Sequence, residues 1–342
     1  MNQPVLNVEN LQVSFRTDDG LVRAVRGVSF DIQAGETVGL VGESGSGKSV
    51  TNLAIMGLVP KPPGVVEAGH AWYGEQDLLA MSHAQLGRIR GHKIAMIFQD
   101  PMTALNPLMT IGQQLTEVTR RHLGINQKEA NRQAIEMLDL VGISGAAKRL
   151  RSYPHEFSGG MRQRVMIAMA LSCEPDILIA DEPTTALDVT IQAQILDLLR
   201  DLQQRRGTSI IMITHDLGVV ANICHRVMVM YAGRIVEKAD AVPLFQEPRH
   251  PYSEGLLASI PRWDQDDSEL LQAIPGQPPD LAHLHPGCSF QPRCPYAEAR
   301  CREEDPGLLP IADAEQRLAA CWFDIRQRQG QWQTVGGEEN VE

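Results

Sequence analysis

Gly42-Glu43-Ser44-Gly45-Ser46-Gly47-Lys48-Ser49 is the stretch that decides how this 342-residue chain folds. It follows the apolar run Thr37-Val38-Gly39-Leu40-Val41, which predicts a buried strand, and it precedes Asn52-Leu53-Ala54-Ile55-Met56, which predicts a helix. A G-x-x-x-x-G-K-[ST] motif between a strand and a helix is typical of a phosphate-binding loop. The sequence therefore predicts a protein that binds a nucleoside triphosphate.

The residue types in this loop suit an anion. Glycine has no Cβ, so successive backbone N–H groups can turn inward around a phosphate, and the N-terminus of the following helix adds partial positive charge. Lys48 can then reach the β- and γ-phosphates, and the Ser49 hydroxyl can ligate Mg²⁺. A glycine-rich turn without a ligand is the alternative interpretation. The predicted nucleotide-binding residues of the loop are Gly42, Ser44, Gly45, Gly47, Lys48 and Ser49.

The composition is that of an ordinary soluble protein, with 43% hydrophobic and 21% charged residues. The net charge of −11 gives no overall basic footprint of the kind that nucleic-acid-binding proteins carry. No uninterrupted apolar run approaches the roughly 18–20 residues of a membrane span, and the first residues lack the pattern of a signal peptide. We therefore expect a cytosolic chain that has no nucleic-acid partner and meets a membrane only through other proteins.

Strand patterns occur in two forms along the chain. Roughly alternating apolar residues in the first forty positions predict strands, with a turn at Asp18-Asp19-Gly20. Continuous apolar runs at 94–98, 177–180 and 210–213 predict strands that are buried on both faces. Because these runs alternate with helical patterns, the sequence predicts an α/β fold with a parallel sheet and helical crossovers.

Helical periodicity dominates residues 103–165, which are predicted to form a helical insertion. One helix is expected to open at Asn126 or Gln127, and another at Ser158-Gly159-Gly160. Beyond about residue 240, frequent prolines and a short acidic run change the character of the chain. We predict a nucleotide-binding domain at 1–240, a connector with one short helix at 241–262, and a small Pro/Cys-rich domain at 263–342.

Polar side chains follow three of the predicted buried strands. Asp181 and Glu182 end one such strand, Gln99 follows another and His215 follows a third. Ligands in open α/β sheets bind at the carboxyl ends of strands, so we expect these groups beside the phosphate loop. Asp181 is placed to hold Mg²⁺ together with Ser49 and Gln99, and Glu182 to polarise an attacking water. His215 can contact the γ-phosphate; a solvated Asp-Glu pair and a structural histidine are the alternatives.

The order of these motifs resembles that of an ABC-transporter ATPase subunit. The segment 42–49 resembles its Walker A motif, Gln99 its Q-loop and Ser158-Gly159-Gly160-Met161 its signature. The segment 177–182 resembles its Walker B motif, Ala186-Leu187-Asp188 its D-loop and His215 its H-switch. The resemblance implies ATP and Mg²⁺ as cofactors, and catalytic roles for Glu182, His215 and Gln99. Met161 departs from the family pattern, in which many members have Gln, but the Ser-Gly-Gly backbone is intact.

The resemblance also implies an architecture and a pairing of domains. The fold would be a P-loop core with an antiparallel β subdomain and a helical subdomain, and two such ATPase domains would pair head to tail. Ser158, Gly159 and Gly160 would then donate hydrogen bonds to the γ-phosphate across the dimer, with Asp188 at that interface. Phe15 stands where the family carries an aromatic residue that stacks on adenine; a strand core residue is the alternative.

Four of the six cysteines, Cys288, Cys294, Cys301 and Cys321, lie in the proline-rich C-terminal region. In a cytosolic chain they are expected to be thiols or metal ligands, and a metal would supply folding energy to a region with little apolar content. Four cysteines can hold an iron–sulfur cluster or tetrahedral Zn²⁺. Long gaps between them and the Cys294-Pro295 pair favour [4Fe–4S] over zinc, with unliganded thiols as a third interpretation.

The C-terminal region narrows the resemblance. His250-Pro251-Tyr252, Ile274-Pro275-Gly276 and 287–295 look like the C-terminal region of dipeptide, oligopeptide and nickel importer ATPases. The segments 99–107 and 159–164 fit the "D" subunit of peptide permeases. This implies peptide import at the cytoplasmic face of the bacterial inner membrane. The implied partners are two transmembrane permeases that contact 99–107, a second, related ATPase, and a periplasmic or lipid-anchored substrate-binding protein.

The sequence leaves other functions open. The cargo could be nickel or another small solute, and the second ATPase could be an identical chain. A soluble ABC ATPase that acts on ribosomes or DNA is disfavoured, because such proteins usually carry two cassettes or a coiled-coil insertion. An exporter ATPase is disfavoured because the chain has no fused membrane span.

Overall fold

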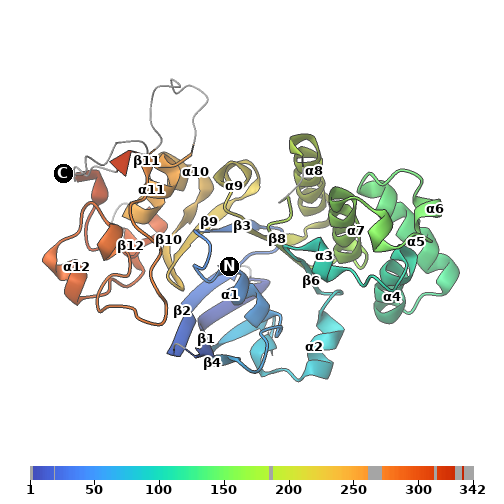
Figure 1. Ribbon diagram of the computed structural model, residues 1–342, viewed down its shortest axis with the longest axis horizontal. Coiled ribbons are helices and arrows are strands. Elements are labelled where there is room, and N and C mark those ends of the chain that lie inside the picture. Colours follow the sequence, from blue (N-terminus) through green and yellow to red (C-terminus); the bar gives the residue numbers. More distant parts are fainter. Residues whose placement is uncertain are drawn as a thin grey trace.

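An eight-stranded sheet runs through the described part of the protein, as the computed structural model shows (Figure 1). The structure describes residues 3–18, 20–184, 188–260, 272–311, 314–327 and 333–334. Parallel strands β9, β3, β8, β7 and β6 are neighbours in that order, and β10, β13 and β12 continue the sheet in antiparallel fashion beyond β9. The strands are β3 Thr37–Val41, β6 Ile94–Ile97, β7 Ile177–Asp181, β8 Ser209–Ile213, β9 Arg226–Tyr231, β10 Arg234–Asp240, β12 Leu309–Ile311 and β13 Ala314–Ala319.

The central strands have apolar side chains on both faces. In β7, Ile177 and Ile179 belong to one core cluster, whereas Leu178 and Ala180 belong to the cluster on the opposite face. Successive residues of a strand point to opposite faces, so a strand covered on both sides must be apolar throughout. This confirms the interpretation of the continuous apolar runs as doubly buried parallel strands.

An antiparallel sheet packs against one face of the central sheet through the cluster that contains Ile177 and Ile179. Its strand order is β2-β1-β4-β5, with β1 Leu6–Thr17, β2 Gly20–Ile32, β4 Gly64–Tyr73 and β5 Gln76–Asp77. The strands predicted in the first forty residues are therefore confirmed; Asp19 of the predicted turn lies outside the described residues. The prediction lacks β4, because Lys61-Pro62-Pro63-Gly64 indicates only a break in the chain. Helix α1, Lys48–Ile55, adds Ala54 and Ile55 to the same cluster.

Helices cover the opposite face of the central sheet and form one end of the molecule (Figure 1). Asn126 caps α5 by accepting a hydrogen bond from the Glu129 N–H at 3.0 Å, and Ser158 caps α7, so both predicted helix starts are confirmed. No helix among the described residues is both long and apolar enough to span a bilayer. The helices on this face are α3 Pro101–Ala104, α4 Ile111–Leu123, α5 Gln127–Leu140, α6 Ala146–Arg149, η2 Pro154–Glu156, α7 Gly159–Leu171, α8 Val189–Arg206 and α9 Leu217–Ile223. Two others, η1 Leu78–Ala80 and α2 His83–Ile89, pack with the antiparallel sheet instead.

The C-terminal part lies at the other end of the molecule (Figure 1). Two short helices, α10 and α11, occupy the segment where we expected one, because Pro251 begins a second helix that is capped by His250. Strand β13 pairs with β10, so the C-terminal chain extends the central sheet. The remaining elements are α10 Ala241–Gln246, α11 Pro251–Ala258, β11 Gln272–Ala273, η3 Gln291–Arg293, α12 Ala299–Glu303, η4 Ile325–Gln327 and β14 Gln333–Thr334.

A buried carboxylate fixes the connector to the sheet. Glu237 of β10 is 0% exposed and accepts hydrogen bonds from the backbone N–H groups of Arg249 at 2.8 Å and His250 at 2.9 Å. Arg317 of β13 approaches the same carboxylate at 3.4 Å. Because a buried carboxylate must be compensated, this set of donors holds β10, β13 and the start of α11 in one arrangement.

We expect His250 to make folding sensitive to mild acid. Burial lowers the pKa of His250 to about 3, from an ordinary value of 6.5, and Nδ1 accepts a hydrogen bond from the Tyr252 N–H at 3.0 Å. The unfolded chain therefore binds a proton below its pKa while the folded chain does not, so stability falls as the pH falls. The expected loss at pH 5 is about 2 kcal/mol from this group.

Chemical denaturation at several pH values tests this expectation. His250→Asn should flatten the pH dependence, because asparagine can cap α11 and does not titrate. Its overall stability is expected to be lower at every pH, since the smaller side chain leaves a cavity. An unchanged slope of stability against pH in this variant would contradict the assignment to His250.

Candidate active site

Four neighbouring parallel strands deliver the predicted site residues to one edge of the sheet. Strand β3 leads into the phosphate loop, β6 is followed by Gln99, β7 ends at Asp181 and β8 is followed by His215 after Thr214. A cavity of about 420 Å³ opens there. It is lined by Phe15, Ala24, Gly42, Ser44, Gly45, Gly47, Lys48, Ser49, Val50, Gln99, Glu182 and His215. The structure thus brings together residues that are up to 200 positions apart in the sequence.

The phosphate loop needs its glycines for space as well as for conformation. Gly42 has φ 150° and Gly47 has φ 102°. A Cβ on Gly42 would lie 2.2 Å from the carbonyl oxygen of Met230, and one on Gly47 would lie 2.4 Å from that of Ala24. Larger residues would therefore push the loop away from β9 and β2, the strands that hold it from behind.

Lys48 is folded back onto its own loop. Its Nζ donates hydrogen bonds to the carbonyl oxygens of Gly42 at 2.7 Å and Glu43 at 2.8 Å, and lies 3.3 Å from Ser46 Oγ. Burial lowers the pKa of Lys48, while the charges of Glu182, Asp181 and Glu43 oppose that shift. The ammonium group therefore stands at the start of α1, where the charges of three carboxylates act on it.

Two oxygen ligands suited to a hard cation lie beside each other. Ser49 Oγ donates a hydrogen bond to Asp181 Oδ1 at 3.1 Å. Burial raises the pKa of Asp181, and the neighbouring charge of Glu182 adds to the rise, while the Ser49 hydrogen bond opposes it. A hydroxyl and a carboxylate in this geometry, with the Gln99 amide nearby in the cavity, fit the all-oxygen chemistry that Mg²⁺ requires.

Glu182 is held from two sides. Its Oε2 accepts a hydrogen bond from Gln99 Nε2 at 2.9 Å, and its Oε1 lies 3.0 Å from His215 Nδ1. The Glu182 backbone has φ 49°, in the left-handed region that costs a non-glycine residue about 1–3 kcal/mol, and its N–H donates to the Ile213 carbonyl at 2.8 Å. Strained backbone conformations are often found where a functional side chain needs a particular direction, and in this conformation Glu182 lines the cavity.

Phe15 lines the cavity at the end of β1 and also packs against the core between the two sheets. Both interpretations of this residue are therefore compatible with its position. Ala24 and Val50 line the same cavity and were not among the predicted residues. Ala24 lies in a strand with no motif around it, and Val50 directly follows the loop motif, which is the only signal that could have found it.

The predicted signature residues do not line this cavity. Ser158 is exposed and caps α7, with Oγ 3.4 Å from the Met161 N–H, and a Cβ on Gly159 would meet no atom within 4 Å. Asp188 caps α8 by accepting a hydrogen bond from the Ile191 N–H at 3.0 Å. Ala186 and Leu187 of the predicted D-loop lie outside the described residues. The N-terminus of α7 therefore presents an open surface with unused backbone N–H groups.

The four C-terminal cysteines lie in one region. The Cys288 N–H donates to the Cys301 carbonyl at 2.8 Å. Burial raises the pKa of Cys288 to about 11 and that of Cys294 to about 12, and the charges of the other cysteines, Cys321 included, contribute to both shifts. Within the described ranges, which contain all four sulfurs, no three His, Cys, Asp or Glu side chains are gathered as a metal site. Four thiols suit a cluster chemically, but their arrangement here is not that of a formed site.

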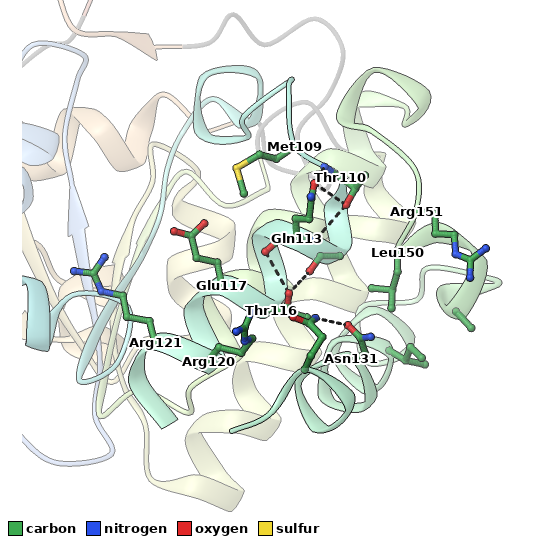
Figure 2. Close-up of a pocket in the computed structure, with 14 residues that line it drawn as sticks. Met109, Thr110, Gln113, Thr116, Glu117, Arg120, Arg121, Asn131, Leu150 and Arg151 are labelled. Carbon is green, nitrogen blue, oxygen red and sulfur yellow. Dashed lines mark hydrogen bonds between the residues drawn. The ribbon is translucent and has the colours of Figure 1, made fainter. Parts of the chain in front are cut away.

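A larger cavity of about 910 Å³ lies among α4, α5 and the segment that follows α6 (Figure 2). Figure 2 shows Met109, Gln113, Glu117, Arg120 and Arg121 arranged along one side of it. It begins next to the predicted contact segment 99–107, in which Met102 is 64% exposed, and Leu108, which follows the segment, is 85% exposed. This face of the helical region combines exposed apolar side chains with a polar hollow.

Comparison with known proteins agrees with this geometry. The family model described as ABC transporter matches residues 25–185, and the model described as oligopeptide/dipeptide transporter, C-terminal region, matches residues 236–301. The oligopeptide transport ATP-binding protein OppD of Bacillus subtilis (strain 168) is 54% identical over 90% of this chain and 86% of its own length. The dipeptide transport ATP-binding protein DppD of Escherichia coli (strain K12) is 50% identical over 91% of this chain and 95% of its own length.

A solved structure shows the same core. The ATP-binding cassette MJ0796, in a dimeric post-hydrolysis state bound to ADP and Pi, superposes with a TM-score of 0.63. The two chains are 26% identical, and the match covers 69% of this chain and 98% of the cassette. The shared part confirms the predicted ABC-type α/β fold. This chain therefore belongs to the ABC-transporter ATP-binding subunits that carry the oligopeptide/dipeptide transporter C-terminal region.

Proposed function

We propose that this chain is the ATP-hydrolysing subunit of an ABC importer for dipeptides or oligopeptides. The observation that carries the proposal is one cavity that joins the phosphate loop to Gln99, Glu182 and His215. Relatives named as oligopeptide and dipeptide transport ATP-binding proteins, at 50–54% identity over nearly the whole chain, support the cargo class. The permeases and the substrate-binding protein would distinguish dipeptides, longer peptides and small solutes such as nickel.

We propose separate roles for the residues of the cavity. The loop N–H groups and Lys48 bind the triphosphate, and Ser49, Asp181 and Gln99 would hold Mg²⁺, which when bound neutralises charge on the phosphates. Glu182 accepts a proton from the attacking water, because its carboxylate is already oriented by Gln99 and His215. His215, with its side chain 66% exposed, is placed to contact the γ-phosphate and Glu182 together. Phe15 would stack on adenine.

A second ATPase domain would complete the site. Ser158, Gly159 and Gly160 form an open helix N-terminus in this chain, which favours a negatively charged ligand brought by another molecule. Head-to-tail pairing would place them over the partner's γ-phosphate, with Asp188 at the interface. We favour a related rather than an identical chain as this partner, by resemblance to peptide importers.

Two permeases would provide the membrane-spanning part. Their coupling helices would pack on 99–107, where the exposed Met102, together with the adjoining Leu108, offers apolar contacts next to the cavity in Figure 2. The chain would then lie at the cytoplasmic face of the bacterial inner membrane, and a periplasmic or lipid-anchored binding protein would select the cargo.

We also propose that Cys288, Cys294, Cys301 and Cys321 bind a metal. Four thiols in one proline-rich region support a [4Fe–4S] cluster, with Zn²⁺ as the alternative. Binding would require the sulfurs to move together and lose their protons. No step of ATP hydrolysis depends on this site.

Purification of the tagged chain from its native membranes, under anaerobic detergent conditions, tests the proposal. We expect two multi-span permeases and a second ATPase to co-purify, and mass spectrometry identifies them. The purified complex is expected to hydrolyse ATP. Measurements of iron, sulfide and zinc on the same sample show whether the four cysteines hold a [4Fe–4S] cluster, Zn²⁺ or no metal. Ribosomal or DNA-bound partners without any permease would show that the transport function is wrong.

A further inference from the structure

An arginine of the C-terminal segment contacts the phosphate loop directly. Arg293, in η3, donates hydrogen bonds from Nη1 to Glu43 Oε2 at 2.7 Å and from Nη2 to Glu43 Oε1 at 2.9 Å. Glu43 is the second residue of the phosphate loop, 250 positions earlier in the sequence. The Arg293 side chain is only 5% exposed and that of Glu43 is 26% exposed, so this is a largely buried, two-pronged ion pair rather than a surface contact.

Arg293 is itself rigidly supported. Its Nε donates to the Pro275 carbonyl at 2.8 Å, and its Nη1 lies 3.4 Å from the Tyr231 hydroxyl. Tyr231 packs against Tyr252 and Phe290, with ring centroids 4.6 and 5.2 Å apart. The C-terminal segment and β9 thus orient Nε and Nη1 of the guanidinium, and the planar fork meets the Glu43 carboxylate with both Nη atoms.

The loop residue Glu43 is held at three points. Its N–H donates to the Tyr252 hydroxyl at 2.7 Å, its carbonyl accepts from Lys48 Nζ at 2.8 Å, and its carboxylate pairs with Arg293. Its neighbours Gly42 and Ser44 line the cavity, whereas Glu43 does not. The ion pair therefore directs a negative charge away from the position of the triphosphate and fixes the entry to the loop.

We propose that Arg293 is a positioning residue of the ATP site, which neutralises and restrains Glu43 so that the phosphate loop can accept a polyanion. ATP affinity in this chain then depends on a segment that lies outside the ATPase core. The inference rests on the proposed function of the loop as the ATP site. Without Arg293, the Glu43 carboxylate is uncompensated beside Lys48, competes for it and repels the phosphates.

Steady-state ATPase kinetics of the purified transporter complex test this role. Arg293→Gln is expected to raise the KM for ATP roughly tenfold, the size typical for loss of hydrogen bonds to a charged partner, and to change kcat less than about twofold. The double variant Glu43→Gln with Arg293→Gln should restore KM to within about threefold of wild type, because the repelling charge is gone. Arg293→Lys keeps the charge without the fork and should fall between wild type and Arg293→Gln.

Salt and folding controls separate this role from a structural one. Raising NaCl from about 50 to 500 mM should narrow the KM difference between Arg293→Gln and wild type, since salt screens the uncompensated carboxylate. An unchanged KM in Arg293→Gln, or a double variant as impaired as the single one, would overturn the proposal. If Arg293→Gln fails to fold, Arg293→Lys and the double variant supply the same comparison. Wild-type complex without ATPase activity would instead refute the proposed function.

Discussion

Replacement of Glu182 by glutamine is expected to lower ATP turnover by about 10²–10⁴-fold while ATP still binds. Glutamine keeps the size of the side chain and can still meet Gln99 and His215, but its amide cannot accept a proton from water. The carboxylate is 16% exposed and is oriented by two neighbours, so it is the group in the cavity best placed to act as a base. The loss should therefore fall on kcat rather than on the KM for ATP.

Glu174→Gln provides a matched control for this substitution. Glu174 also has a positive φ, 50° against 49° for Glu182, but it is exposed, pairs with Arg206 and does not line the cavity. The same chemical change in the same backbone conformation should leave turnover within about twofold of wild type, as surface substitutions usually do. A Glu182→Gln protein that hydrolyses ATP at the wild-type rate would exclude Glu182 as the base.

The strand ends could be predicted from the sequence because they depend on local patterns. Continuous apolar runs must be doubly buried strands, and parallel neighbours carry the residues that follow them to one edge of the sheet. This reasoning places Lys48, Asp181, Glu182 and His215 together without any knowledge of the strand order. The positive φ of Glu182 is different, because this residue, whose N–H donates to the Ile213 carbonyl of β8, carries no trace of its backbone conformation in its residue type.

Contacts between distant segments could not be predicted. The pair formed by Glu43 and Arg293 spans 250 positions, and Glu43 stands at a position that the G-x-x-x-x-G-K-[ST] motif leaves unspecified. The buried Glu237 likewise looks like an ordinary surface residue of a strand until Arg249, His250 and Arg317 are placed around it. Tertiary compensation of a buried charge has no local signature, so only the folded chain shows it.

Lys48→Ala is expected to abolish detectable ATP binding and to reduce turnover by about 10²–10³-fold or more, the cost of losing a donor aimed at developing phosphate charge. Lys48 is a positively charged residue that lines the cavity, and the charges of Glu182, Asp181 and Glu43 all raise its pKa. With alanine in its place, Asp181 and Glu182 lose the positive charge that acts on them, whereas Glu43 keeps its ion pair with Arg293. The site then repels the triphosphate instead of attracting it.

Thermal unfolding with and without ATP separates Lys48→Ala from Glu182→Gln in one assay. A ligand that binds only the folded state raises its stability by about 2.7 kcal/mol at a hundredfold excess over Kd, so the melting temperature of Glu182→Gln should rise with ATP and that of Lys48→Ala should not. Lys128→Ala, on an exposed position of α5, should respond like wild type. Lys48→Arg keeps the charge but has a wider head group than the loop accommodates, so it should bind ATP weakly. A full ATP-dependent rise in Lys48→Ala would mean that the backbone N–H groups and α1 alone hold the nucleotide, and that Lys48 serves only to close the empty loop through Gly42 and Glu43.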